Sequence, residues 1–244
     1  MALSKAQLKI LRRLKQKKYR YLDKKFTAEG NKLVNDLMEA GWRPDDIYAH
    51  DEVDLKLFPG AELISKSDRK LLSSQDNPSG VLAVFRMPEI QHPDELDSSA
   101  LALYGVQDPG NMGTIIRTAA WFGFTQLVLL DGCVDPFNEK AVQASMGSIA
   151  HINLIVAPNA YLEKWKADGF NLLAADMQGD DVYAFDWPKK WLLLMGNEGQ
   201  GLKGLPTDCQ SITIPSLASN GPESLNVSIA TAVILSAMIQ KMRL

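Results

Sequence analysis

From residue 100 onward, apolar strand-like segments alternate with helical segments. Most strand-like segments are continuous apolar runs, which suits strands covered on both faces of a parallel sheet. They are ALALYGVQ (100–107), QLVLLDG (126–132), INLIVAP (152–158), FNLLAADM (170–177), WLLLMGN (191–197) and SITIPS (211–216). Helices are expected at 111–123, about 138–147, about 159–168 and 223–242, with a short turn near 202–207. The pattern predicts an α/β domain that binds ligands beyond the carboxyl ends of its strands.

The preceding residues predict a smaller α/β domain. A helix is expected within EGNKLVNDLMEAGW (29–42) and a shorter one at KSDRKLLSS (66–74), with strands at DIYAH, AELIS and GVLAVFRM. The polar stretch that follows contains two prolines and is typical of a linker. The predicted organisation is a domain at 1–88, a linker at 89–99 and a second domain at 100–244.

The N-terminal segment is strongly basic, although the whole chain carries a formal net charge of −3. Residues 1–25 contain ten Lys or Arg side chains and a single acid. One interpretation is an RNA or DNA contact, in which bases pair with phosphates and the tyrosines stack. The other is a solvated amphipathic helix packed on its own domain; a membrane-surface helix suits the narrow apolar face less well. The candidate RNA contacts are Arg12, Arg13, Lys17, Lys18 and Arg20.

Composition narrows the possible classes of protein. The chain has two cysteines, Cys133 and Cys209, so a disulfide framework is not expected and a reducing cytoplasm is the natural location. Its three scattered histidines predict no metal site. No apolar run is long enough to span a membrane, and the N-terminus lacks a signal-peptide core.

Two loops after predicted strands carry candidate chemistry. In DPGNMGTIIR, Asn111 is expected to cap a helix whose lone charge, Arg117, is either a surface anchor or a phosphate or substrate ligand. In GNEGQGLKG the glycine spacing differs from that of a dinucleotide loop, and Glu198 would repel a pyrophosphate. This second loop therefore indicates a small-molecule site, with a tight structural turn as the alternative.

The third loop, SLASNGPESLNVS (216–228), precedes the last helix. Asn220 and Glu223 have capping-box spacing, which predicts that the helix begins there. Ser224 would then belong to the cap. Asn226 would fall on the apolar face of the helix, where its amide needs partners.

Together these three loops resemble the SpoU/TrmH family of RNA ribose 2′-O-methyltransferases, in the SPOUT superfamily. The motifs are N-x-G-x-x-x-R-x-A from Asn111, G-N-E-G-x-G-L from Gly196, and I-P…S-L-N-V-S-x-A from Ile214. The N-terminal part resembles, more loosely, the family's L30e-like substrate-binding domain. The loop at 216–223 is longer than many members carry, which bears on contacts such as Ser216.

The resemblance implies a parallel α/β domain with a deep trefoil knot, dimerisation through the knotted domain, and transfer of a methyl group from S-adenosylmethionine to tRNA or rRNA. It implies cofactor contacts from Leu194, Met195, Gly196, Gly201, Ile214, Ser216, Leu225 and Asn226. It implies a catalytic set of Arg117, Asn111, Glu198, Ser224 and Asn226, and no metal. Arginine is a poor base, so Arg117 is either the proton acceptor or a clamp on the RNA. Two alternatives remain open: a non-catalytic RNA-binding protein on this fold, and a nucleotide-binding oxidoreductase.

Overall fold

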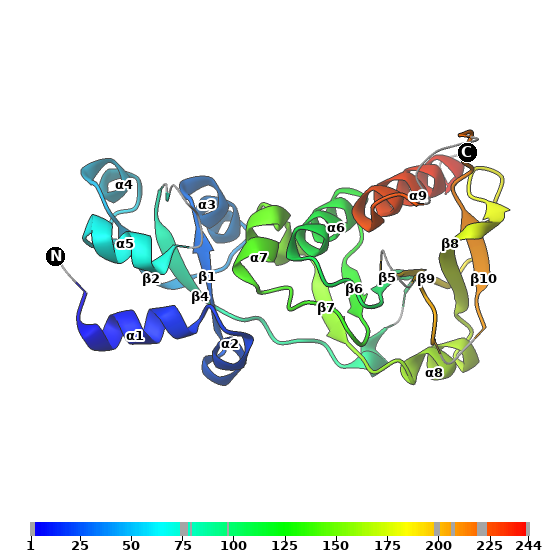
Figure 1. Cartoon of the computed structure of the whole chain (residues 1–244), viewed down its shortest axis with the longest axis horizontal. Coiled ribbons are helices and arrows are strands. Elements are labelled where there is room, and N and C mark those ends of the chain that lie inside the picture. Colours follow the sequence, from blue (N-terminus) through cyan, green and yellow to red (C-terminus); the bar gives the residue numbers. More distant parts are fainter. Residues whose placement is uncertain are drawn as a thin grey trace. The chain divides into compact units, whose positions relative to one another are not determined.

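The computed structural model describes residues 3–73, 78, 80–96, 98–197, 201–205, 208–218 and 224–242. The chain divides into two compact units (Figure 1). Unit 1 contains residues 1–89 and 135–150, and unit 2 contains residues 90–134 and 151–244. Within the described ranges, no helix has both the length and the apolar character needed to cross a bilayer.

Unit 1 is built on a four-stranded sheet in the order β1-β4-β2-β3. β4 (Leu82–Arg86) lies antiparallel to both β1 (Lys25–Glu29) and β2 (Pro44–Ala49), and β2 pairs in parallel with β3 (Glu62–Leu63). The predicted helices and strands of this region are confirmed, but β1 and α4 were not predicted. The helices of unit 1 are α1 (Lys5–Arg13), α2 (Lys17–Asp23), α3 (Asn31–Glu39), α4 (Glu52–Leu57), α5 (Lys66–Leu72) and α7 (Glu139–Ser145).

The basic segment forms two helices rather than one. Ser4 and Gln7 form a capping box that starts α1, and Lys24, in a left-handed conformation, ends α2. Leu11 and Leu14 are buried in a core shared with β2, β4 and α5. The amphipathic helix packed on its own domain is therefore present, with most of its cations in solvent.

Residues 135–150 follow β6 (Gln126–Leu129) of unit 2 in the chain but pack against the N-terminal residues. The Arg20 guanidinium donates from Nε to Asp135 Oδ2 at 2.8 Å, and the Tyr21 hydroxyl donates to Asp135 Oδ1 at 3.2 Å. Burial, and then the Asp135 charge, raise the pKa of Tyr21. The ring of Phe26 in β1 packs against that of Phe137 at a tilt of 48°, with ring centroids 5.2 Å apart. This buried contact makes α7 an integral part of unit 1.

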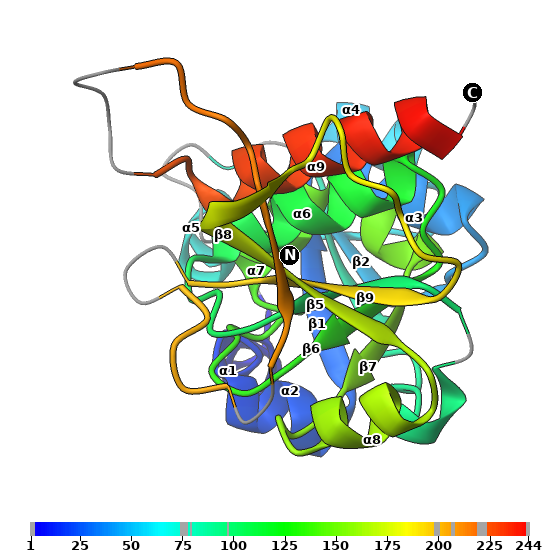
Figure 2. The same cartoon turned by 90° about the vertical axis from the view of Figure 1, so that its right-hand side faces the viewer.

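Unit 2 contains a six-stranded sheet in the order β10-β8-β9-β5-β6-β7, in which every pair is parallel. Helices α6 and α9 cover one face and α8 lies on the other (Figure 2). The two-sided cover explains the continuous apolar strands, and the parallel α/β prediction is confirmed. The strands are β5 (Ala100–Leu103), β6 (Gln126–Leu129), β7 (Asn153–Val156), β8 (Asn171–Asp181), β9 (Trp191–Met195) and β10 (Gln210–Thr213); the helices are α6 (Pro109–Trp121), α8 (Tyr161–Ala167) and α9 (Val227–Met242).

Candidate active site

A cavity of about 800 Å³ opens where β8, β9 and β10 end or diverge. β8 pairs with β9 only as far as Ala174, so the chain from Ala174 to Met177 turns away and forms one wall. The ends of β9 and β10 and the start of α9 supply the others. Ligand pockets typically have volumes of about 300–1,000 Å³, so this cavity can take a nucleoside-sized molecule.

Most of the predicted cofactor contacts meet in this cavity. Those that line it are Met195, Gly196, Gly201, Ile214, Ser216 and Leu225, together with the predicted catalytic residue Ser224. Leu194 is not part of the described lining; its side chain is fully buried in the core formed around β9. Asn226 also lies outside the described lining and contacts α6 instead.

In the turn after β9, the backbone at Gly196 and Gly201 approaches too closely for a side chain at position 196. A Cβ on Gly196 would lie 2.5 Å from the carbonyl carbon of Gly201, closer than real Cβ atoms approach backbone. The Gly201 amide donates to the Asn197 carbonyl at 2.8 Å, and the Asn197 side-chain amide donates to the Gly105 carbonyl at 2.9 Å. Backbone therefore forms this side of the cavity. Glu198, predicted to be catalytic, falls outside the described residues.

The start of α6 differs from the prediction. The cap is Asp108, whose Oδ1 accepts from the Asn111 amide at 2.8 Å; the prediction that Asn111 caps this helix was wrong. Asn111 therefore lies in the first turn of the helix, three residues after the cap. Its Oδ1 accepts a hydrogen bond from Asn226 Nδ2 at 3.0 Å. Two predicted catalytic residues, 115 positions apart, are thereby brought together.

The start of α9 was also mispredicted. The helix begins at Val227, and Ser224 to Asn226 precede it in non-helical backbone. Asn226 is exposed and caps the helix: its Oδ1 accepts from the Ser228 amide at 2.9 Å and from the Ser228 hydroxyl at 2.7 Å. Placing Asn226 on an apolar helix face was therefore wrong, since its amide is bonded at both ends. The capping box predicted at Asn220 and Glu223 lies outside the described residues.

Arg117 lies on the exposed face of α6, opposite the buried side chains Ile115 and Ile116. Within the described part of the chain it forms no ion pair and does not line the cavity. The surface-anchor interpretation, in which Arg117 pairs with an acid or the linker, has no support in these contacts. The guanidinium is instead open to an anionic partner in solution.

Sequence reasoning missed the wall contributed by β8. Ala175, Asp176 and Met177 line the cavity, and the Met177 carbonyl accepts from the Thr213 hydroxyl at 3.1 Å. Asp176 places a carboxylate at the rim. β8 lies between β9 and β10 in the sheet, and that order cannot be read from the linear sequence.

Comparison with known proteins identifies this arrangement. Residues 98–236 match the SpoU rRNA Methylase family, and residues 5–83 match an MRM3-like substrate binding domain. The chain belongs to the SpoU rRNA methylase family. A 23S rRNA (guanosine-2′-O)-methyltransferase of Bacillus subtilis is 30% identical over 92% of both chains.

Similarity to solved structures supports the same assignment. An S-adenosylmethionine-bound rRNA methyltransferase of Sinorhizobium meliloti is 30% identical, with a TM-score of 0.84 over 99% of this chain and 97% of that one. A tRNA-modifying TrmH/SpoU enzyme of A. aeolicus is 27% identical, with a TM-score of 0.51 over 60% of this chain and 76% of that one. This SpoU-family chain is an S-adenosylmethionine-dependent RNA 2′-O-methyltransferase, and the oxidoreductase interpretation was wrong.

The cavity suits that cofactor chemically. Apolar strand ends at Met195 and Ile214 match an adenine and a thioether, and the glycine turn exposes backbone donors and acceptors. Asp176 at the rim complements the positive charge of a sulfonium or an ammonium group.

Proposed function

We propose that this SpoU-family enzyme methylates a ribose 2′-hydroxyl of large-subunit rRNA rather than of tRNA. The observation that carries the proposal is the extent of the similarity. The 23S rRNA relative aligns with both units of the chain, whereas the tRNA-modifying structure aligns with only 60% of it. Since a separate substrate-binding domain selects the RNA, sharing that domain favours a shared class of RNA.

The test is ribose-methylation mapping of total RNA by mass spectrometry, from a strain lacking the gene and from that strain with the gene restored. We expect one 23S rRNA site to lose its methyl group and regain it on restoration. Loss of a tRNA methyl group with unchanged 23S rRNA would contradict the target while leaving the chemistry intact.

For catalysis, the cofactor contacts are proposed to be the cavity-lining residues Met195, Gly196, Gly201, Ile214, Ser216 and Leu225. When bound, S-adenosylmethionine supplies an electrophilic methyl group whose departure leaves a neutral thioether. The chain must position the RNA hydroxyl and allow its proton to leave. We assign positioning to Arg117, a permanent cation that can clamp the phosphate beside the target ribose.

Asn111 and Asn226 have a supporting role in this proposal. Their mutual hydrogen bond, with the Asn226 cap on α9, fixes the starts of α6 and α9 relative to each other. That bond orients the first turns of the helix that carries Arg117 and of the helix that borders the cavity. Ser224, which lines the cavity, and Glu198 complete the proposed catalytic set.

The basic helices α1 and α2 are proposed to bind RNA through Arg12, Lys17 and Lys18, which are exposed. The Arg13 side chain is 36% exposed and forms an ion pair with Asp23, with 2.7 Å between Nη2 and Oδ2. The RNA contact predicted for Arg20 was wrong, because that side chain is 2% exposed and pairs with Asp135.

Neutralising the three exposed cations together, as Arg12→Gln, Lys17→Gln and Lys18→Gln, should weaken RNA binding. The slope of log affinity against log salt should fall by about 0.7–0.9 for each RNA phosphate that the variant no longer neutralises. Filter binding over a salt series measures both quantities. The matched control neutralises exposed Lys32, Lys56 and Lys66 of the same unit. An equal loss of RNA affinity in that control would contradict the proposal that α1 and α2 form the RNA contact. Deleting residues 1–25 is a poor test, because Leu14 and Arg20 are buried.

Dimerisation through unit 2, with the trefoil knot that the family carries, is part of the same proposal. Large apolar side chains that a monomer would leave in solvent support it: Trp121 on α6 is 85% exposed, and Leu225 and Ile229 beside and within α9 are about half exposed. Sedimentation at micromolar concentration should give twice the chain mass of 26.9 kDa; a monomer mass would contradict it. A cytoplasmic location is proposed with it, since a chain with two cysteines carries too few for a disulfide framework.

A further inference from the structure

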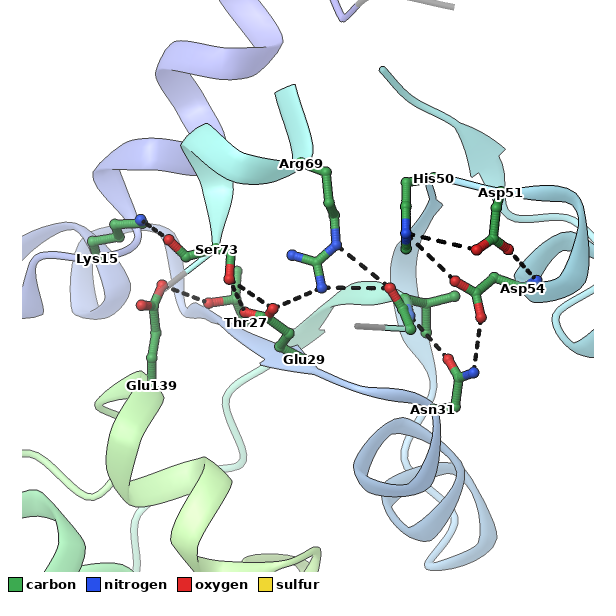
Figure 3. A network of polar contacts seen from close by, with 12 residues as sticks. Lys15, Thr27, Glu29, Asn31, His50, Asp51, Asp54, Arg69, Ser73 and Glu139 are labelled. Atoms are coloured by element: carbon green, nitrogen blue, oxygen red, sulfur yellow. Dashed lines mark hydrogen bonds and ion pairs between the residues drawn. The ribbon is translucent and has the colours of Figure 1, made fainter. Parts of the chain in front are cut away.

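We propose that unit 1 carries a divalent-cation site, formed by His50, Asp51 and Asp54, that prefers a borderline metal such as Zn²⁺ to Mg²⁺. His50 follows β2, Asp51 caps α4 and Asp54 lies in the first turn of α4. One ligand atom from each of the three lies within 4.8 Å of the others. Figure 3 shows the imidazole of His50 facing both carboxylates.

The buried carboxylate of Asp54 is the independent sign of a ligand. Asp54 is 4% exposed, and its Oδ2 has no hydrogen-bond donor among the described residues. His50 Nδ1, at 3.5 Å, is likewise buried and without a hydrogen-bond partner there. Two polar atoms that face each other unsatisfied at this depth are costly unless a third group lies between them.

The spacing of these two atoms matches ligands of one metal better than a hydrogen bond. Tetrahedral Zn²⁺ with bonds of about 2.0–2.2 Å separates two of its ligand atoms by about 3.4 Å. The separation of Nδ1 and Oδ2 is 3.5 Å, at the outer limit of a hydrogen bond. Asp51 Oδ2 lies 3.6 Å from the other ring nitrogen, Nε2, and this side chain, which is 44% exposed, would have to turn toward Nδ1 to complete the set.

A second group orients the buried ligand. Asn31 Nδ2 donates to Asp54 Oδ1 at 2.8 Å, and Asn31 Oδ1 in turn accepts from the Val81 amide at 2.9 Å (Figure 3). One carboxylate oxygen is thus held by the fold, and the other is left facing the imidazole. Such orientation of ligands by outer groups is characteristic of protein metal sites.

The ligand set determines the class of metal. One imidazole nitrogen with two carboxylate oxygens suits Zn²⁺ and its neighbours, whereas Mg²⁺ favours oxygen ligands in octahedral geometry and retains its waters. Three protein ligands leave a further position toward solvent, because the His50 side chain is 18% exposed. The site is separate from the cavity of unit 2, whose described lining contains none of these residues.

The test is titration of the full-length chain, first freed of metal with a chelator, with Zn²⁺ by calorimetry and with Co²⁺ by visible absorption. We expect saturable binding at one site per chain and no competition from millimolar Mg²⁺. The Co²⁺ absorption spectrum should be that of a four-coordinate, tetrahedral ion. Asp54→Asn should weaken binding by more than the roughly 10- to 100-fold typical of losing an outer-shell partner. This variant keeps an oxygen to accept from Asn31, so it should fold, which circular dichroism checks.

Matched controls separate this site from other ligands. Asp94→Asn alters the exposed His92–Asp94 pair of unit 2, whose Nδ1–Oδ2 distance is 3.2 Å. Cys209→Ser removes a half-buried thiol. Both should bind Zn²⁺ as the wild type does. Wild-type affinity in Asp54→Asn and in His50→Gln, or equal displacement by Mg²⁺, would overturn the proposal.

Discussion

Replacing Arg117 with alanine should reduce the rate of RNA methylation at least about 100-fold, the loss typical of one positioned charged or hydrogen-bonding group in a transition state. The affinity for S-adenosylmethionine should remain within about twofold, since Arg117 is absent from the described lining of the cavity. The fold should persist, because the side chain is exposed and alanine favours helix. Single-turnover methylation of 23S rRNA fragments and calorimetry with S-adenosylhomocysteine measure the two effects.

The pH profile of the Arg117→Ala variant separates a clamp from a base. Loss of a phosphate clamp would raise the KM for RNA and lower the rate by a similar factor at every pH. Loss of a general base would instead let the residual rate climb with hydroxide. Arg117→Lys should recover only part of the activity, because an ammonium cannot grip a phosphate in the bidentate way. Lys189→Ala, at an exposed cation of the same unit, is the control; wild-type turnover by Arg117→Ala would refute the assignment.

The strands and helices of unit 2 could be predicted because each leaves a signal within its own short stretch of sequence. Continuous apolar runs such as that of β9 report burial on both faces, and glycine turns report strand ends. The strand order could not be read in the same way. Nothing in residues 170–177 shows that β8 lies between β9 and β10, so the wall at Asp176 was missed.

The caps of α6 and α9 were also predicted wrongly, again because the answer depends on contacts between distant residues. Asp108 and Asn111 both suit a helix start, as do Asn220, Ser224 and Asn226, and propensity does not rank them. Tertiary contact favours one combination: with Asp108 and Asn226 as the caps, the side chains of Asn111 and Asn226 also bond to each other. The expectation that the chain has no metal site rested on the spacing of histidines and cysteines and did not weigh the carboxylates beside His50; it stays a prediction that the proposed titration tests.

Replacing Arg20 with methionine should destabilise unit 1 by about 3–5 kcal/mol, because it leaves the Asp135 carboxylate buried without its cation. Arg20 and Asp135 are 2% and 4% exposed, and the guanidinium also donates from Nη1 to the Leu14 carbonyl at 2.8 Å. Only Tyr21 and the Phe137 amide, among the described residues, would still donate to the Asp135 carboxylate. Hydrogen exchange of β1 and α2 should speed up about 100- to 5,000-fold, since exchange of protected amides follows the free energy of opening.

Two further variants test whether burial of the Arg20–Asp135 pair causes the predicted loss of stability. The double variant Arg20→Met with Asp135→Asn should regain much of the loss, because removing both charges spares the desolvation penalty of the survivor. Arg13→Met breaks the pair with Asp23, which joins the same two kinds of group on the same segment but has its arginine 36% exposed. That change should cost no more than about 1 kcal/mol. Similar losses for Arg13→Met and Arg20→Met would show that residues 135–150 are not held in unit 1 by the buried ion pair, and that the apolar contact of Phe26 with Phe137 carries the packing instead.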